Sequence, residues 1–214
     1  TRTLGLPETL LGLVPGWGGC YLLPRLVGAA DAYRIILDDP PAGGRHTDAG
    51  TAARIGLVDA VLPDEGFVEA SLEWAGEVLE GRTVPRRPLD DAATWLRETA
   101  AARERLDRRL HGAAPAPYRA LDLVSAARTR DRDAAFAAED EALADLFGTD
   151  ELRAGLYASD LTTRRARTTA GAPDPALATP VRQVGIVGAG LMAAQLAVAI
   201  GGRLQVPVRL REVD

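Results

Sequence analysis

The sequence predicts an α/β protein with a helix-rich first part, a helical middle part and a β-α-β unit close to its end. Apolar residues recur every three or four positions over most of the chain, as they do in amphipathic helices. Two proline-rich segments, residues 82–89 and 171–180, interrupt this pattern, and a β-type run then leads through a glycine-rich turn into a last helix. We therefore expect three parts, at residues 1–81, 82–180 and 181–214.

The first part is predicted to consist of short helices and turns. Residues 4–19 are rich in glycine and proline and are expected to follow an irregular path. Apolar residues at helical spacing in 20–37, interrupted at Gly28, predict two short helices. The remaining predicted elements are a short helix capped by Thr47 or Asp48 and ending near Gly56, a strand at 57–63 and a helix at 64–81.

The middle part is rich in alanine and arginine and is predicted to be an α-helical connector. Its glycine and proline residues separate the helical stretches, which are expected at residues 90–111, 118–129, 132–147 and 150–167.

The composition is typical of a globular protein and argues against several kinds of partner. The 214 residues are 47% hydrophobic, and 30 acidic against 25 basic residues leave a net charge of -5, so we expect no nucleic acid partner. The hydropathy pattern predicts no transmembrane segment and, with no signal-peptide pattern, a cytoplasmic protein. Cys20 is the only cysteine, and His46 and His111 have no ligand-like neighbours, so neither a disulfide nor a metal site is expected.

Glu8 is the acidic residue of the glycine- and proline-rich segment at 4–19. A carboxylate beside an apolar run can be desolvated, which raises its pKa and suits it to transfer a proton at a carbon next to a carbonyl. Taken alone, however, a single glutamate near a helix start is more often a surface residue or a partner of the helix dipole.

The last part carries the pattern G-x-G-x-x-A between a β-type run and an apolar helix. Gly188 would form the tight turn, Gly190 would let the backbone approach a pyrophosphate, and Ala193 would let the helix pack closely on the strand. An acid about 20 residues further on, after a second β-type run, typically binds the ribose hydroxyls of NAD and disfavours the 2′-phosphate of NADP. Asp214 is a lesser candidate for that acid. This order predicts the first β-α-β unit of a Rossmann fold, with NAD held by Gly188, Gly190, Leu191, Met192, Ala193 and Glu212.

Three motifs occur together in the first part. They are L-P-E-x-x-L-G-L-V-P-G-W-G-G at residues 6–19, L-P-R-L-V-G at 23–28 and A-x-x-G-L-V-D-x-V at 53–61. Together they resemble the second half of the enoyl-CoA hydratase (crotonase) superfamily, over residues 1–81. The resemblance implies the helix-rich second half of a crotonase-like ββα-spiral domain.

The crotonase resemblance also implies site residues. Glu8 matches one of the family's two catalytic carboxylates, the one that handles the proton added to or removed from the acyl chain. The family's second carboxylate, which activates water, and the N–H groups that hold the thioester oxygen lie upstream of the motifs present here. The residues implied to line the acyl pocket are Pro15, Gly16, Trp17, Gly18 and Gly19, although tight packing without ligand contact explains the glycines equally well.

The segment V-G-A-G-L-M at residues 187–192 resembles the start of the NAD-binding domain of 3-hydroxyacyl-CoA dehydrogenases. A crotonase half, a helical connector and this motif, in this order, resemble the multifunctional fatty acid β-oxidation enzymes, the alpha subunits of fatty acid oxidation complexes. That resemblance implies hydration of an enoyl-CoA followed by NAD-dependent oxidation of the 3-hydroxyacyl-CoA. It also implies an acyl-CoA thioester substrate, a thiolase subunit as a partner and homo-oligomer formation.

The chain has no initiating methionine and stops at the end of a predicted strand, so we expect it to be a fragment that is inactive alone. Two alternatives remain. One is an enoyl-CoA isomerase or another crotonase activity that uses Glu8 as its sole base. The other is a non-catalytic truncated product or scaffold, in which the alanine- and arginine-rich helices act mainly as an interaction surface.

Overall fold

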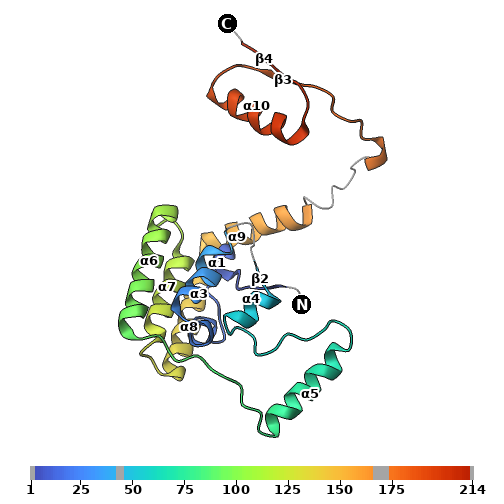
Figure 1. Cartoon of the computed structure of the whole chain (residues 1–214). Helices are drawn as coiled ribbons and strands as arrows, with labels where there is room; N and C mark the ends of the chain where they lie inside the picture. The colour runs from blue at the N-terminus through green and yellow to red at the C-terminus, as the bar shows by residue number, and fades with distance from the viewer. Residues whose placement is uncertain (1–2, 42–45, 166–173, 213–214) are drawn as a thin grey trace. The chain divides into compact units, whose positions relative to one another are not determined.

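The computed structural model describes residues 3–41, 46–165 and 174–212. The chain forms two compact units, Thr1–Arg167 and Thr168–Asp214 (Figure 1). Most of the helices belong to the first unit, and the second contains a pair of parallel strands with a helix between them.

The first unit begins with strand β1 (Thr3–Leu4), which pairs antiparallel with β2 (Thr47–Asp48). The helices of the first part are α1 (Glu8–Leu11), α2 (Gly19–Val27), α3 (Ala29–Tyr33), the π-helix η1 (Arg34–Asp38), α4 (Ala49–Arg54) and α5 (Phe67–Leu79). The helices that follow are α6 (Ala92–Leu110), α7 (Pro115–Ala127), α8 (Arg132–Phe147), α9 (Asp150–Asp160) and the π-helix η2 (Leu161–Arg165).

Short polar side chains cap four of these helices at their N-termini. Asp48 accepts the backbone N–H of Thr51 at 2.9 Å and begins α4, so Asp48 rather than Thr47 is the cap. Asp91, Asp131 and Thr149 make the same contact at the starts of α6, α8 and α9. The observed ranges of α6 to α9 confirm the helices predicted for the middle part, although α7 begins at Pro115, three residues before its predicted start. The last one continues beyond Asp160 as η2, and its predicted residues 166–167 lie outside the described residues.

The helices predicted as a connector pack into the same core as the first part. Helix α6 contacts α3, and α7 contacts α2, α3 and η1. The hydroxyl of Tyr33 on α3 lies 2.7 Å from Thr99 Oγ1 on α6. The largest fully buried side chains come from both parts and include Tyr33, Ile36, Leu37, Leu106, Leu121 and Val124. The buried alanines of α6 and α7 allow the close approach of these helices.

The strand predicted at residues 57–63 is wrong, because this segment forms turns and irregular chain. The backbone N–H groups of Leu57 and Val58 both donate to the carbonyl of Ala52, at 2.8 and 3.4 Å. These N–H groups therefore complete the end of α4, and the apolar residues are not paired with a neighbouring strand. A β-type composition forms a strand only where such a partner is available.

Helix α5 confirms the helix predicted at 64–81, over a shorter range. It has no buried residue, and its side chains Phe67, Val68, Leu72 and Leu79 are more than half exposed. The segment at residues 4–19, which was expected to be irregular, also contains a short helix, because residues 8–11 form the single turn of α1.

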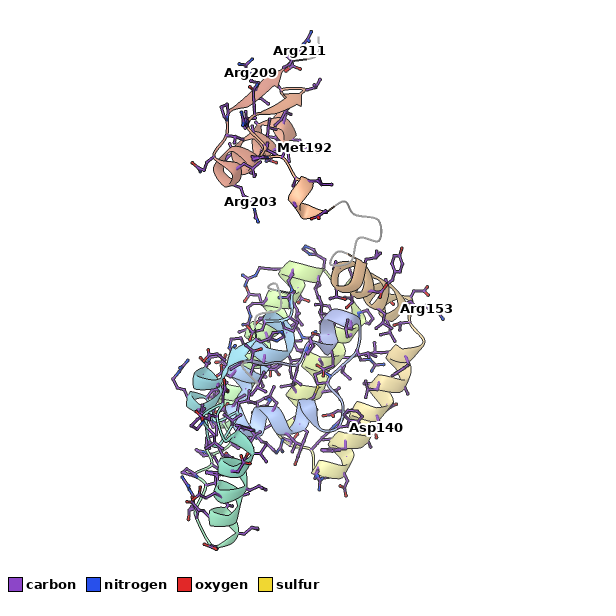
Figure 2. All side chains as sticks on the ribbon, turned by 90° about the vertical axis from the view of Figure 1, so that its right-hand side faces the viewer. Asp140, Arg153, Met192, Arg203, Arg209 and Arg211 are labelled. Carbon is purple, nitrogen blue, oxygen red and sulfur yellow. The ribbon has the colours of Figure 1, made fainter. Side chains whose placement is uncertain are left out.

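The second unit contains β3 (Val184–Val187), α10 (Leu191–Leu204) and β4 (Val208–Arg211), after a short 3₁₀ turn η3 (Pro175–Leu177). Strands β3 and β4 are parallel, with Val184 opposite Val208 and Val187 opposite Arg211. Helix α10 contacts both strands, and Met192 lies at its beginning (Figure 2). Of the helices in the described ranges, none combines the length and the apolar character needed to cross a bilayer.

Candidate active site

Glu8 is the first residue of α1, directly after Pro7. The helix ends after one turn because Gly12 adopts a left-handed conformation, with φ of 96°, and its N–H donates to the carbonyl of Glu8. Leu13 donates to the same carbonyl at 3.0 Å. Two hydrogen bonds thus fix the backbone of Glu8, so that the position of its side chain is set by a rigid turn.

The carboxyl group of Glu8 is desolvated, which is one of the environments that the sequence allowed. Its Oε2 atom is buried and has no hydrogen-bond partner in the described structure. Burial raises the pKa of the Glu8 carboxyl above its ordinary value, and a hydrogen bond to its own backbone lowers it to a smaller extent. A carboxyl in such a site keeps its proton to a higher pH than an exposed one and can act as an acid or a base. The catalytic role of Glu8 remains a prediction.

The predicted pocket residues 15–19 form a turn that leads into α2. The N–H of Gly19 donates to the carbonyl of Gly16 at 3.0 Å. Trp17 and Gly18 both have positive φ, 53° and 86°, and Gly18 is the N-cap of α2. Glycine adopts this conformation without strain, whereas a tryptophan rarely does. The Trp17 side chain is nevertheless 93% exposed, so that the turn presents an indole ring on the surface.

Packing accounts for the glycines of this turn. A Cβ added to Gly16 would lie 2.8 Å from Leu143 Cδ1, one on Gly18 would meet the ring of Phe136, and one on Gly19 would lie 2.6 Å from the Pro15 side chain. Of the two interpretations, close packing therefore explains Gly16, Gly18 and Gly19 directly. Contact of residues 15–19 with an acyl group stays a prediction, and the exposed Trp17 is the residue of the turn that is most accessible to a ligand.

Helix α9 packs directly against α1. A Cβ on Gly12 would lie 2.9 Å from the Cα of Leu152, and a Cβ on Gly155 would meet the backbone carbonyl of Leu11. The two helices touch through backbone at these glycines, so the predicted connector determines where Glu8 can lie.

Sequence reasoning missed Glu139 on α8. Its side chain is buried, and it accepts hydrogen bonds from the backbone N–H groups of Gly18 and Tyr21. A signal was present in the sequence, because Glu139 shares helical spacing with Ala135, Ala142 and Leu146, which are all buried. An acid on an apolar helix face needs partners, and here those partners are on α2.

Cys20 is buried in the core, directly before Tyr21, whose N–H donates to Glu139. Its Sγ donates to the carbonyl of Pro15 at 3.6 Å. Burial raises the pKa of the Cys20 thiol, and the charges of Glu139 and Glu8 raise it further. The thiol therefore stays protonated and packs as a small apolar side chain.

An apolar groove of about 660 Å³ lies elsewhere in the first unit. Its lining includes Leu4, Val58, Val61, Leu62 and Phe67, but neither Glu8 nor any residue of 15–19. The groove is therefore not continuous with the candidate site around Glu8.

The predicted cofactor residues lie together in the second unit. Gly188 follows β3 and Glu212 follows β4, and Gly188 N donates to the carbonyl of Arg211 at 2.6 Å. The two residues therefore stand at the carboxyl ends of adjacent parallel strands, which is where nucleotides bind in open α/β sheets. Asp214, the lesser candidate, lies outside the described residues.

The glycine-rich turn has open space beside both Gly188 and Gly190. Gly188 needs to be glycine because its φ is 97°. Gly190 has an ordinary φ of -69°, and a Cβ added to it would meet no atom within 4 Å, so protein packing does not require a glycine there. The space beside Gly190 thus suits a close ligand, next to the start of α10, which carries no side-chain cap.

Ala193 allows α10 to approach the strands. It is half-buried, as are Ala197 and Ile200 at helical spacing, whereas Leu191 and Met192 are largely exposed. The small side chain at 193 therefore faces the strands, as the pattern predicts. Leu191 and Met192 lie in the first turn of α10 beside Gly190.

Comparison with known families gives the first part an assignment. The family model described as enoyl-CoA hydratase/isomerase matches residues 1–117, which include Glu8, the turn at 15–19 and helix α6. The match extends beyond residue 81 into the segment predicted as a connector. The chain therefore belongs to the enoyl-CoA hydratase/isomerase family.

Proposed function

We propose that this chain is part of a bifunctional fatty acid β-oxidation enzyme, which hydrates a trans-2-enoyl-CoA and oxidises the resulting 3-hydroxyacyl-CoA with NAD. The observation that carries the hydratase half is the desolvated Glu8 carboxyl, whose buried Oε2 has no hydrogen-bond partner, in a chain of the crotonase family, whose substrates are acyl-CoA thioesters. Its position in a rigid turn and its raised pKa are what proton transfer to an acyl chain requires.

Hydration adds water across the C2=C3 bond of the enoyl thioester. The water oxygen bonds to C3, the π electrons move toward the thioester carbonyl, and C2 then takes a proton. Protonated Glu8 supplies that proton and becomes a carboxylate. By the family resemblance, a second carboxylate upstream accepts the proton that the water loses, and exchange with solvent restores both groups.

The oxidation half is proposed for the second unit. When bound, NAD would accept the hydride from C3 of the 3-hydroxyacyl-CoA, and the hydroxyl proton would pass to a base or to solvent, which leaves the 3-ketoacyl-CoA and NADH. The backbone at Gly188 and Gly190 and the first turn of α10, with Leu191 and Met192, would hold the pyrophosphate, and Glu212 would bind the ribose hydroxyls. The parallel pairing of β3 with β4 supports this proposal, because it brings Gly188 and Glu212 to one edge.

The proposal is tested by three assays on the complete protein that contains this chain. Loss of enoyl-thioester absorbance with a trans-2-enoyl-CoA measures hydration, and NADH formation from a 3-hydroxyacyl-CoA measures oxidation. Conversion of a trans-3-enoyl-CoA measures isomerisation. We expect the first two activities. Isomerisation without hydration would instead favour the isomerase alternative, and the absence of all three would favour a non-catalytic product.

The substitution Glu212→Gln tests the cofactor half. Loss of a charge-assisted hydrogen bond to the ribose should weaken NAD binding by about tenfold and narrow its advantage over NADP. The matched control is Glu80→Gln, which removes the same charge from an exposed position in the first unit. Dissociation constants for both cofactors are measured by titration. An unchanged preference for NAD in Glu212→Gln would remove this residue from the cofactor site.

A further inference from the structure

The carboxylate of Glu139 joins α8 to the turn that precedes α2. Its side chain is 1% exposed, Oε2 accepts the Gly18 N–H at 2.6 Å, and Oε1 accepts the Tyr21 N–H at 3.0 Å. Helix α2 has no side-chain cap of its own, since its N-cap is Gly18. One buried carboxylate therefore satisfies two backbone donors that lie 118 and 121 residues away in the sequence.

Two other side chains of α8 meet the same turn. The Phe136 ring covers Gly18 and packs edge-on against Tyr21, with ring centroids 6.2 Å apart. Leu143 lies against Gly16, within 2.8 Å of where a Cβ would be. Phe136, Glu139 and Leu143 follow one another at spacings of three and four, so they lie on one face of α8. This face contacts the turn at Gly16 and Gly18.

The turn needs this support because its conformation is strained. Trp17 has a φ of 53°, a region that costs a non-glycine residue free energy, and its exposed ring gains little from packing. The hydrogen bonds at Gly18 and Tyr21 fix the backbone immediately after it. The turn also lies close to the segment that carries Glu8, because a Cβ added to Gly19 would lie 4.0 Å from Leu6 Cδ1, two residues before Glu8.

We infer that Glu139 is a positioning residue for acyl-CoA binding: it holds residues 16–19 in the conformation that presents Trp17 to the acyl chain. The inference rests on the proposed hydratase function. Glu139 touches no reacting atom and acts through the turn. A role in fold stability alone would lower the stability of the protein without changing its affinity for substrate.

The substitution Glu139→Gln tests this inference in the complete protein. The amide nitrogen of glutamine is a donor, so at least one of the two backbone N–H groups loses its acceptor and the turn is released. We expect KM for the enoyl-CoA to rise by about tenfold, with a much smaller change in kcat and no change in 3-hydroxyacyl-CoA oxidation. Hydrogen exchange measured on peptides covering residues 16–23 should be faster in the variant.

Two further variants separate positioning from stability. Leu146→Ala removes a buried side chain from the same helix and should destabilise the protein while leaving KM unchanged. Phe136→Leu keeps an apolar, half-buried side chain but uncovers Gly18, so it should raise KM even if Glu139→Gln does not fold.

Each outcome bears on one of the two proposals. An unchanged KM in the folded Glu139→Gln and Phe136→Leu variants, or an equal rise in Leu146→Ala, would overturn the positioning role. Faster exchange at 16–23 without a change in KM would also overturn it, because Glu139 would then only stabilise the turn. If the unmodified protein shows no hydration, the proposed function itself fails, and the exchange measurement still reports whether Glu139 holds the turn.

Discussion

Replacing Glu8 by glutamine should lower the rate of enoyl-CoA hydration by about a thousandfold in the complete protein. Glutamine has the size of glutamate and leaves the single turn of α1 intact, but it has no proton to give to C2. Oxidation of a 3-hydroxyacyl-CoA with NAD should stay within about twofold of the unmodified protein, because its proposed residues lie in the second unit. Both activities are measured on the same preparation.

The pH dependence of hydration gives an independent measure of the same group. Only protonated Glu8 can donate to C2, so the rate should fall as the pH rises through the pKa of Glu8. Desolvation raises this pKa, and the fall should therefore occur at higher pH than for an exposed glutamate. In the Glu8→Gln variant, the remaining rate of hydration should not show this fall with rising pH. Equal loss of hydration and oxidation in the variant would refute the assignment of the two activities to separate units.

Replacing Gly155 by valine should lower the free energy of unfolding of the chain by about 3 kcal/mol. A Cβ at this position overlaps the backbone carbonyl of Leu11 and lies 2.8 Å from its carbon, and neither atom can rotate away. Helix α9 must then move off α1, which opens the contact between Gly12 and Leu152 as well. Chemical denaturation followed by circular dichroism measures the change.

The control for this substitution is Gly76→Val. Gly76 also lies inside a helix, α5, but a Cβ added there meets nothing within 4 Å. The stability of that variant should stay within about 0.5 kcal/mol of the original. Since α1 carries Glu8, Gly155→Val should also reduce hydration in the complete protein. A stability change as small as that of the control would show that α9 does not bear on α1 in solution.

Local patterns in the sequence predicted most of the helices, whereas the burial of Glu8 became clear only from the structure. Apolar periodicity and the glycine and proline residues between the helical stretches predicted α6 to α9, because these patterns involve only neighbouring residues. The structure adds the caps Asp91, Asp131 and Thr149, which the sequence analysis did not single out. The segment 57–63 shows where such reasoning fails. Its composition favours a strand, but strand formation depends on a partner elsewhere in the chain, and its N–H groups bind Ala52 instead.

The candidate sites also combine features that the sequence predicts with features that only the tertiary structure shows. The sequence alone indicated the crotonase motifs, Glu8 as a candidate for proton transfer, and the order of Gly188, Gly190, Ala193 and Glu212, since these depend on residue type and spacing. Only the tertiary structure decided that α8 and α9 support the turn at 15–19 and helix α1. Those contacts join residues more than a hundred positions apart, and they depend on which helix faces meet when the core packs.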